Sequence, residues 1–288
     1  METLLQVIVS GVSTGSIYAL MALGMTVIYR STTVLNFAHG ESLMLGGFFA
    51  YVSLVQFRLP YPVAIVVSLA GIVVVGYLTD KVAFQPLLNA GHLQQVLATV
   101  ALLFIFRGVV RFISVDERAL PPLLGNTRWT ISGVALDPQR IIIAIVVVTT
   151  SLGFAYVFRR TDIGRVIRAS TQNLRGCALV GIDLKRVFSG MWMSGILLAG
   201  IAGILAAPLL LVRPDMGSRP LLLGFAGMTL GGFGSFPGAV VGAILVGLVE
   251  STANFYVSTS LGDVAGLALI FLILLVRPKG LFGTEDVA

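Results

Sequence analysis

The sequence predicts an all-α, polytopic bundle of helices in a membrane. Of its 288 residues, 57% are hydrophobic and only 11% are charged, whereas soluble domains carry about 25% charged residues. Apolar runs of about 20 residues, the length a helix needs to cross a hydrocarbon core, recur along the chain. Alternating strand patterns are not seen, so helices are the expected way of satisfying backbone hydrogen bonds in lipid.

Nine apolar stretches account for the expected membrane elements. In order they are Leu4–Tyr29, Val34–Phe57, Pro62–Thr79, Leu93–Ile113, Ile141–Phe158, Val187–Val212, Leu221–Phe236, Gly238–Val257 and Val264–Val276. The third, seventh and ninth are short for a perpendicular span. Because the second or the seventh also fits a re-entrant half-helix, we expect roughly eight to ten membrane elements, some discontinuous or re-entrant.

One strongly basic connection orients the chain. Residues 159–186 contain seven Lys or Arg and two Asp, a balance of +5 out of a formal net charge of +6. Basic loops between apolar helices stay on the cytoplasmic side. We therefore expect the N-terminus outside, the C-terminus in the cytoplasm, and the polar, turn-rich segment 114–139 outside. No linker or low-complexity tract divides residues 1–288, so a single membrane domain is expected.

The residue inventory argues against several classes of function. The basic residues are concentrated in one connection, which disfavours nucleic-acid binding. None of the lysines, at Lys81, Lys185 and Lys279, follows a glycine, so a Walker-type phosphate loop is absent; if ATP supplies energy, another chain must bind it. Two histidines and the single Cys177 predict neither a metal site nor a disulfide. No cofactor is expected, and the first apolar stretch lacks the basic n-region of a signal peptide.

An amide, an imidazole and a carboxylate stand immediately before the second apolar stretch, in the run Val34-Leu35-Asn36-Phe37-Ala38-His39-Gly40-Glu41. Ionisable groups inside membranes are expensive and usually face a cavity or a partner. Two interpretations stay open. In one, a discontinuous helix presents Asn36, His39, Gly40 and Glu41 to a translocation path. In the other, His39 and Glu41 pair with each other near the cytoplasmic surface and fix a helix start.

Two further polar pairs lie on apolar stretches. Glu250 and Asn254 are one helical turn apart and share a face. They either line the pathway or, as we favour, hydrogen-bond inside the bundle. Arg107 and Arg111 are also one turn apart, near the expected outer end of their helix. We expect them to extend to the membrane interface and assign them no function.

Glycines mark expected breaks and contacts. The run Gly231–Gly238 cannot continue an undisturbed helix, because glycine lowers helix propensity and proline removes a donor. Gly232, Gly234, Pro237 and Gly238 therefore form either a plain turn or a moving gate. Glycines four apart predict close packing of helices within the chain. These pairs are Gly11 and Gly15, Gly227 and Gly231, Gly238 and Gly242, and Gly262 and Gly266.

The basic connection 159–186 also carries apolar residues at helical spacing. They are Val166, Ile167, Ala169, Ala178, Leu179 and Ile182. Such a short amphipathic helix suits docking on another protein, which we favour over a loop that is solvated or touches anionic lipid.

Several motifs together resemble one family. They are Gly15-Ser16-Ile17-Tyr18-Ala19-Leu20, Ala22-Leu23-Gly24, Leu35-Asn36-Phe37-Ala38-His39-Gly40-Glu41, the loop ending Gly181-Ile182, the stretch Gly231–Gly242, and Arg277-Pro278-Lys279-Gly280-Leu281-Phe282-Gly283. With these motifs, which cover most of its length, the chain resembles the branched-chain amino acid ABC transporter permeases of the LivH type. The Asn-Phe-Ala-His-Gly-Glu run is the most specific of them.

The resemblance implies a transmembrane permease domain over residues 1–288, with a cytoplasmic coupling loop at 159–186 and an external loop at 114–139. It implies translocation of branched-chain or related amino acids across the bacterial inner membrane by alternating access. The implied partners are a homologous second permease, more often in a heterodimer, two cytoplasmic ATP-binding subunits and a periplasmic solute-binding protein. The residues implied in ATPase coupling are Arg165, Arg168, Asn173, Ala178, Gly181 and Ile182.

The chain departs from the family pattern at Arg175 and Gly176, where relatives commonly place acidic residues and alanine, so the detailed ATPase contact is expected to differ. A self-sufficient secondary transporter or channel for urea, an amide or an organic acid stays open as an alternative. It would need ion-coupling groups within one chain, for which Glu41 and Glu250 are the candidates. An enzyme is disfavoured because no nucleophile, base and orienting group fall in a recognisable arrangement.

Overall fold

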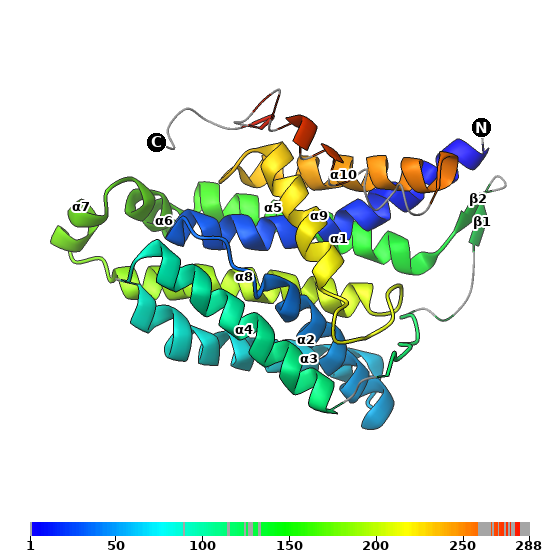
Figure 1. Ribbon diagram of the computed structural model, residues 1–288, viewed down its shortest axis with the longest axis horizontal. Helices are drawn as coiled ribbons and strands as arrows, with labels where there is room; N and C mark the ends of the chain where they lie inside the picture. The colour runs from blue at the N-terminus through cyan, green and yellow to red at the C-terminus, as the bar shows by residue number, and fades with distance from the viewer. Residues whose placement is uncertain are drawn as a thin grey trace.

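The computed structural model is an elongated bundle of helices whose connections gather at its two ends (Figure 1). It describes residues 2–88, 90–113, 116–123, 125, 129–131 and 134–258 and, after these, 266, 268–269, 271–273, 275, 277 and 280–282. The helices are α1 (Glu2–Thr32), α2 (His39–Tyr51), α3 (Tyr61–Thr79), α4 (His92–Ile113), α5 (Pro138–Arg160), α6 (Asp162–Gln172), α7 (Leu174–Leu179), α8 (Leu184–Ala206), α9 (Ser218–Gly231) and α10 (Phe236–Tyr256).

Short helical turns extend two of these helices. A π-helical turn, η1 (Val52–Gln56), continues α2, and η2 (Asp80–Phe84) with η3 (Gln85–Leu87) continues α3. Within the described residues, six helices are long and apolar enough to cross a membrane. They are Thr3–Thr32, Tyr61–Leu87, His92–Ile113, Pro138–Arg160, Leu184–Ala206 and Phe236–Tyr256.

Helix α1 forms the centre of the bundle and packs against α8, α9 and α10. Its middle is buried because the neighbouring backbones approach it closely. A Cβ on Gly15 would lie 2.8 Å from the Cα of Ile244, and one on Gly11 would lie 2.9 Å from the Cα of Leu248. The spacing of Gly11 and Gly15 therefore predicted this internal contact correctly.

Close backbone contact at glycine also joins α9 to α10. A Cβ on Gly227 would lie 2.5 Å from the Cα of Ala243, and one on Gly242 would overlap the carbonyl oxygen of Gly227. The predicted close packing at these glycines is confirmed. Of the last predicted pair, Gly262 lies outside the described residues.

Helices α2 and α9 both begin partway along the bundle (Figure 1). After α1 ends, residues 33–38 turn back into the bundle without helical structure, and α2 starts at His39. Helix α9 follows a non-helical segment, 207–217, and has 14 residues. The half-helix interpretation, offered for the second or the seventh apolar stretch, thus fits both.

The outer surface of the bundle is apolar over α3, α4 and α5. Large side chains there, such as Val66, Phe104 and Leu152, are at least 65% exposed. Such a surface is suited to lipid, since water would not solvate it well. Helix α5 packs mainly against α1 and only slightly against α10, which leaves space between α5 and α10.

The polar connections form the two ends of the bundle (Figure 1). We call one end the α6 end, because α6 and α7 lie there, within the predicted coupling loop 159–186. The loop itself is shorter than predicted, since α5 continues to Arg160 and α8 already starts at Leu184. At the opposite end, here the hairpin end, the antiparallel strands β1 (Trp129–Ile131) and β2 (Val134–Leu136) pair Thr130 with Ala135. This hairpin was not expected, because strands of three residues leave no readable alternation.

The predicted all-α class holds, with six candidate spans and two half-helices in the described part of the chain. The ninth predicted stretch, Val264–Val276, lies largely outside the described residues. Of the external loop 114–139, residues 114–115, 124, 126–128 and 132–133 are outside them too, and α5 begins one residue before that loop was expected to end.

We expect Gly203→Ala to destabilise the fold, because a Cβ there would overlap the carbonyl oxygen of Leu43 on α2. Overpacking of this kind costs about 1–3 kcal/mol. Gly190, on the same helix, has nothing within 4 Å of a Cβ, so Gly190→Ala should be neutral or stabilising by about 0.5–1 kcal/mol. Thermal unfolding of the purified protein in detergent distinguishes the two, and equal midpoints would contradict the α2–α8 packing.

Candidate functional site

The amino ends of the two half-helices meet inside the bundle. A Cβ on Gly217, just before α9, would overlap the carbonyl oxygen of Gly40 in the first turn of α2, so the two helix starts touch backbone to backbone. The first turn of a helix has unpaired N–H groups and carries partial positive charge. This half-helix junction, made by Gly40, Glu41, Gly217 and Ser218, is therefore favourable for negative charge.

One ion pair ties α4 to the half-helix junction. Nη2 of Arg107 lies 2.5 Å from Oε1 of Glu41 and donates to Oγ of Ser218 at 2.8 Å. The Glu41 side chain is only 2% exposed. The prediction that Arg107 extends to the membrane interface is wrong, because a carboxylate buried this deeply needs a charged partner and Arg107 turns inward to supply it.

A second ion pair ties α9 to α10. Nη2 of Arg219, in the first turn of α9, is bonded to Oε1 of Glu250. The Tyr18 hydroxyl of α1 interacts with both groups. The Glu250 side chain is 4% exposed, and its Oε2 has no hydrogen-bond partner among the described residues. Glu250 thus bonds to Arg219 inside the bundle and also lines the cavity at the hairpin end that is described below.

His39 is fully buried and does not pair with Glu41. Its ring packs where α1 and α8 come close, since a Cβ on Gly24 would lie 2.6 Å from Nε2 of His39. The interpretation in which His39 and Glu41 satisfy each other is therefore wrong. The reason is geometric, because Glu41 faces Arg107 while His39 faces Gly24.

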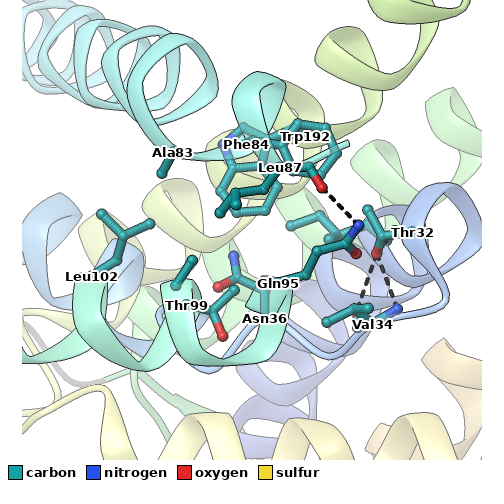
Figure 2. A pocket seen from close by; sticks show the side chains of 12 residues that line it. Thr32, Val34, Asn36, Ala83, Phe84, Leu87, Gln95, Thr99, Leu102 and Trp192 are labelled. Atoms are coloured by element: carbon teal, nitrogen blue, oxygen red, sulfur yellow. Dashed lines mark hydrogen bonds between the residues drawn. The ribbon is translucent and has the colours of Figure 1, made fainter. Parts of the chain in front are cut away.

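Asn36 organises the segment that precedes α2. Its Oδ1 accepts from the N–H of Ala38 at 3.0 Å, an Asx turn of the kind that sets up helix starts. Figure 2 shows Asn36 beside Gln95 and Thr99 of α4 at a small pocket of about 20 Å³. Such a volume holds about one water, so Asn36 lies on a packed interface in this structure.

A large cavity of about 650 Å³ opens at the hairpin end between α1, α5 and α10. Its wall carries charges of both signs, with Arg140 on one side and Asp137 and Glu250 as the acidic residues. Nη1 of Arg140 donates to Oγ of Ser10 at 3.0 Å, and Oγ of Ser251 donates to the carbonyl oxygen of Val7 at 3.0 Å. The residues lining this hairpin-end cavity are Thr3, Gln6, Val7, Val9, Ser10, Thr14, Asp137, Arg140, Glu250, Ser251, Asn254 and Phe255.

A second cavity, of about 460 Å³, lies between the same three helices at the α6 end. The ring of Phe158 contacts that of Phe236 at 4.4 Å between centroids and stacks on Phe154 at 5.6 Å. The residues lining this α6-end cavity are Tyr29, Arg30, Thr33, Ala155, Phe158, Arg159, Arg168, Gln172, Phe233, Gly234, Ser235, Phe236, Pro237 and Phe282.

The predicted break at Gly231–Gly238 is an ordered turn. Gly232 and Gly234 have φ values of 101° and 78°, which favour glycine. Oγ of Ser235 accepts from the N–H of Gly238 at 3.2 Å and caps α10. The N–H groups of Leu281 and Phe282 donate to the carbonyl oxygens of Leu230 and Gly231 at 2.8 and 3.0 Å. A segment from the end of the chain therefore covers the last turn of α9.

The residues expected to couple to an ATPase lie at the α6 end of the bundle. Arg165 pairs with Asp162, and Arg168 donates to the carbonyl oxygen of Phe158 at the end of α5. Oδ1 of Asn173 accepts from the N–H of Gly176 at 2.8 Å and starts α7. These interactions are local, and they build the shape of the loop.

After α7 the chain turns back toward α8. Gly181 has a φ of 81°, and the N–H of Ile182 donates to the carbonyl oxygen of Cys177 at 3.0 Å. Ala178 is exposed, and Leu179 and Val180 are 88% and 76% exposed. The tip of α7 is thus an apolar projection from a basic loop.

Comparison with known proteins identifies the family. Residues 7–276 match the family described as "Branched-chain amino acid transport system / permease component". The chain belongs to this family. The permease is accordingly a multi-pass membrane protein and a transport subunit without catalytic activity, and ATP hydrolysis lies on a separate subunit, as the missing phosphate loop predicted.

The relatives of this permease match it over most of its length. It is 28% identical over 297 residues to the high-affinity branched-chain amino acid transport system permease protein LivH of Escherichia coli K12, with 98% of this chain and 96% of that protein covered. It is 29% identical over 297 residues to the corresponding protein BraD of Pseudomonas aeruginosa, with 98% and 97% covered. The ribose import permease protein RbsC of E. coli K12 is 28% identical over 279 residues, with 92% and 83% covered.

Sequence reasoning missed four residues of the permease that now stand out. They are Arg107, Arg140, Ser218 and Arg219. Arg107 carried a usable signal, since an arginine that far inside an apolar stretch needs a partner. Arg219 follows the pattern of a helix start, with Ser218 before it and Pro220 after it, but nothing in the sequence pairs it with Glu250.

We expect Arg107→Ala to destabilise the permease by ~3 kcal/mol, because it leaves the Glu41 carboxylate buried without its partner. The double variant Glu41→Gln/Arg107→Gln should recover much of this loss, since no charge is left unpaired. Arg186→Ala is the control, because the pair of Arg186 with Asp183 is exposed and contributes less than about 1 kcal/mol. Additive losses at Glu41 and Arg107, measured by thermal unfolding, would contradict the coupling.

Proposed function

We propose that the permease moves branched-chain or related amino acids by alternating access, as the membrane subunit of an ATP-binding-cassette importer. The observation that supports this most directly is the hairpin-end cavity. It combines a guanidinium, a buried carboxylate and an apolar surface. Its volume of about 650 Å³ is in the range of small-molecule pockets, about 300–1,000 Å³.

A zwitterionic amino acid fits the chemistry of this cavity. Arg140 is the group for the α-carboxylate, and Glu250 with Asn254 is the group for the α-ammonium. The two groups lie beside the same part of α1. Arg140 bonds Ser10 of α1, and Ser251, next to Glu250, bonds Val7 of α1. The apolar side chains of Val7, Val9 and Phe255 suit a branched aliphatic side chain.

The path we propose runs along α1 between α5 and α10. The two cavities lie at opposite ends of this gap. Opening one end while closing the other requires α5 and α10 to move relative to each other. The turn with Gly232, Gly234, Pro237 and Gly238 is the proposed gate, because Gly234 and Pro237 line the α6-end cavity.

We divide the expected pathway residues into two groups. Glu250 and Asn254 contact the solute directly in this proposal. Asn36, His39, Gly40 and Glu41 hold the half-helix α2 in position, since their bonds and contacts fix its start. Arg219 links the solute-contacting residues to those at the start of α2. It pairs with Glu250, and it lies at the start of α9, which touches the start of α2.

The basic α6–α7 loop is placed in the cytoplasm, where the exposed α7 tip docks on an ATP-binding subunit. Arg165, Arg168, Asn173, Ala178, Gly181 and Ile182 shape or present that surface. A homologous second permease, two ATP-binding subunits and a periplasmic solute-binding protein complete the proposed importer.

Cysteine labelling tests the orientation. In a Cys177→Ala background, Leu179→Cys at the α7 tip should react with a membrane-impermeant maleimide in inside-out vesicles and not in intact spheroplasts. Glu117→Cys, at the hairpin end, should show the reverse accessibility. Labelling of Leu179→Cys from the periplasmic face would overturn both the orientation and the ATPase contact.

Reconstitution tests the solute and its site. Leucine uptake into proteoliposomes that contain the assembled importer should require ATP and the ATP-binding subunits. Arg140→Gln should raise KM about tenfold, because hydrogen bonds to charged groups contribute about 1.5–3 kcal/mol. The control is Arg58→Gln, an exposed arginine that does not line the cavity. Uptake without the ATP-binding subunits, or an Arg140→Gln variant that behaves like the control, would overturn the proposal.

A further inference from the structure

Two buried amide atoms border the small pocket beside α4, and neither has a hydrogen-bond partner among the described residues. This α4 pocket lies between the end of α1, the turns η2 and η3, α4 and α8, and its volume is about 20 Å³ (Figure 2). Its described wall shares no residue with either cavity of the proposed solute path. The occupant of the α4 pocket is therefore separate from the transported solute.

Asn36 supplies a hydrogen-bond donor with a fixed orientation. Its side-chain Oδ1 accepts from the N–H of Ala38 at 3.0 Å, so the amide is oriented and Nδ2 is left to donate elsewhere. Asn36 is only 4% exposed, and no described residue accepts from Nδ2. Because a buried donor without a partner is costly, Nδ2 needs an acceptor from outside the described chain.

Gln95 of α4 supplies the matching acceptor. Its Nε2 donates to the carbonyl oxygens of Leu87 and Ala90 at 2.9 and 3.2 Å, which fixes the orientation of this amide as well. Oε1 of Gln95 is buried and receives no hydrogen bond from the described residues. A donor and an acceptor thus border the same pocket, and each is oriented by bonds made elsewhere.

This pair of atoms defines the chemistry of the occupant. An anion would accept from Asn36 but would be repelled by the oxygen of Gln95, and a cation would meet the opposite mismatch. An apolar molecule would leave both atoms unsatisfied. The occupant must therefore accept and donate at once, and a volume of about 20 Å³ limits it to one water.

One wall of the α4 pocket is aromatic. The rings of Phe84 and Trp192 stack with their centroids 4.6 Å apart, and the two residues are 7% and 3% exposed. The indole N–H of Trp192 already donates to Oγ1 of Thr79 at 3.2 Å. This side of the pocket offers little hydrogen bonding to an occupant, so the two amides hold it.

We propose that the α4 pocket holds one ordered water, which accepts from Nδ2 of Asn36 and donates to Oε1 of Gln95. The water connects α4 to the segment before α2, where Thr99 of α4 accepts from the N–H of Phe37 at 3.3 Å. Two of the 22 residues of α4, Thr99 and Val110, are buried. Because apolar packing holds this helix so sparingly, polar connections of this kind position it against the start of α2.

X-ray radiolysis of the assembled importer, read out by mass spectrometry, tests the proposal. Radiolysis converts a bound water into a hydroxyl radical, which oxidises the side chains beside it. Trp192 should therefore be oxidised despite its burial, whereas Met191, 1% exposed and outside the pocket, should be protected. Methionine reacts readily with this radical, so Met191 reports on access of bulk water. Equal oxidation of the two residues, at any level, would overturn the proposal.

Matched variants separate a held water from general access. Ala98→Val adds two methyl groups to the pocket wall, keeps both amides, and should reduce oxidation of Trp192 to the level of Met191. Gln95→Leu removes the acceptor and should cause the same loss. Ala101→Val, an exposed position of α4 outside the pocket, should change nothing.

Continued protection of Met191 in each variant shows that the fold is kept. Oxidation of Trp192 that persists in Ala98→Val or in Gln95→Leu would overturn the proposal, because the radical would then come from water that the amides do not hold. A loss in Ala101→Val equal to that in Ala98→Val would overturn it as well.

Discussion

The contact between the starts of α2 and α9 is the constraint on which the rest of the bundle depends. Two helix starts can meet inside a membrane protein only if their free N–H groups and nearby charges find partners. Glycine at positions 40 and 217 permits the approach. Arg107 and Arg219 then connect the junction to α4 and α10 through Glu41 and Glu250. Four helices are thereby fixed relative to one another.

Helix α5 stands apart from this rigid unit. It packs along α1 and scarcely against α10, and a cavity lies at each end of the gap. A helix held along one side can change its tilt at little cost in buried contacts, whereas α1, α9 and α10 are interlocked through glycine. The division between a fixed unit and a loosely packed helix is what a transporter that exposes its site alternately to two sides requires.

The sequence was informative wherever the signal is local. Hydropathy located the spans, Gly231–Gly238 predicted the break before α10, and the glycine pairs predicted close packing at Gly15 and Gly227. The ion-pair partners of buried charged side chains could not be predicted from the sequence, because they depend on the fold. One of the two interpretations paired Glu41 with the neighbouring His39, whereas its partner Arg107 lies 66 residues away. The cavities were equally beyond reach, since they arise from the spacing of α5 and α10.

The segment that covers the end of α9 has a practical meaning for work on this protein. The backbone N–H groups of Leu281 and Phe282 donate to carbonyl oxygens in the last turn of α9, which lipid would leave unsatisfied. Leu281 and Phe282 are therefore part of the packed architecture. Fluorescent fusions and affinity tags belong beyond Phe282, and shortening the chain into this segment would uncap the half-helix that carries Arg219.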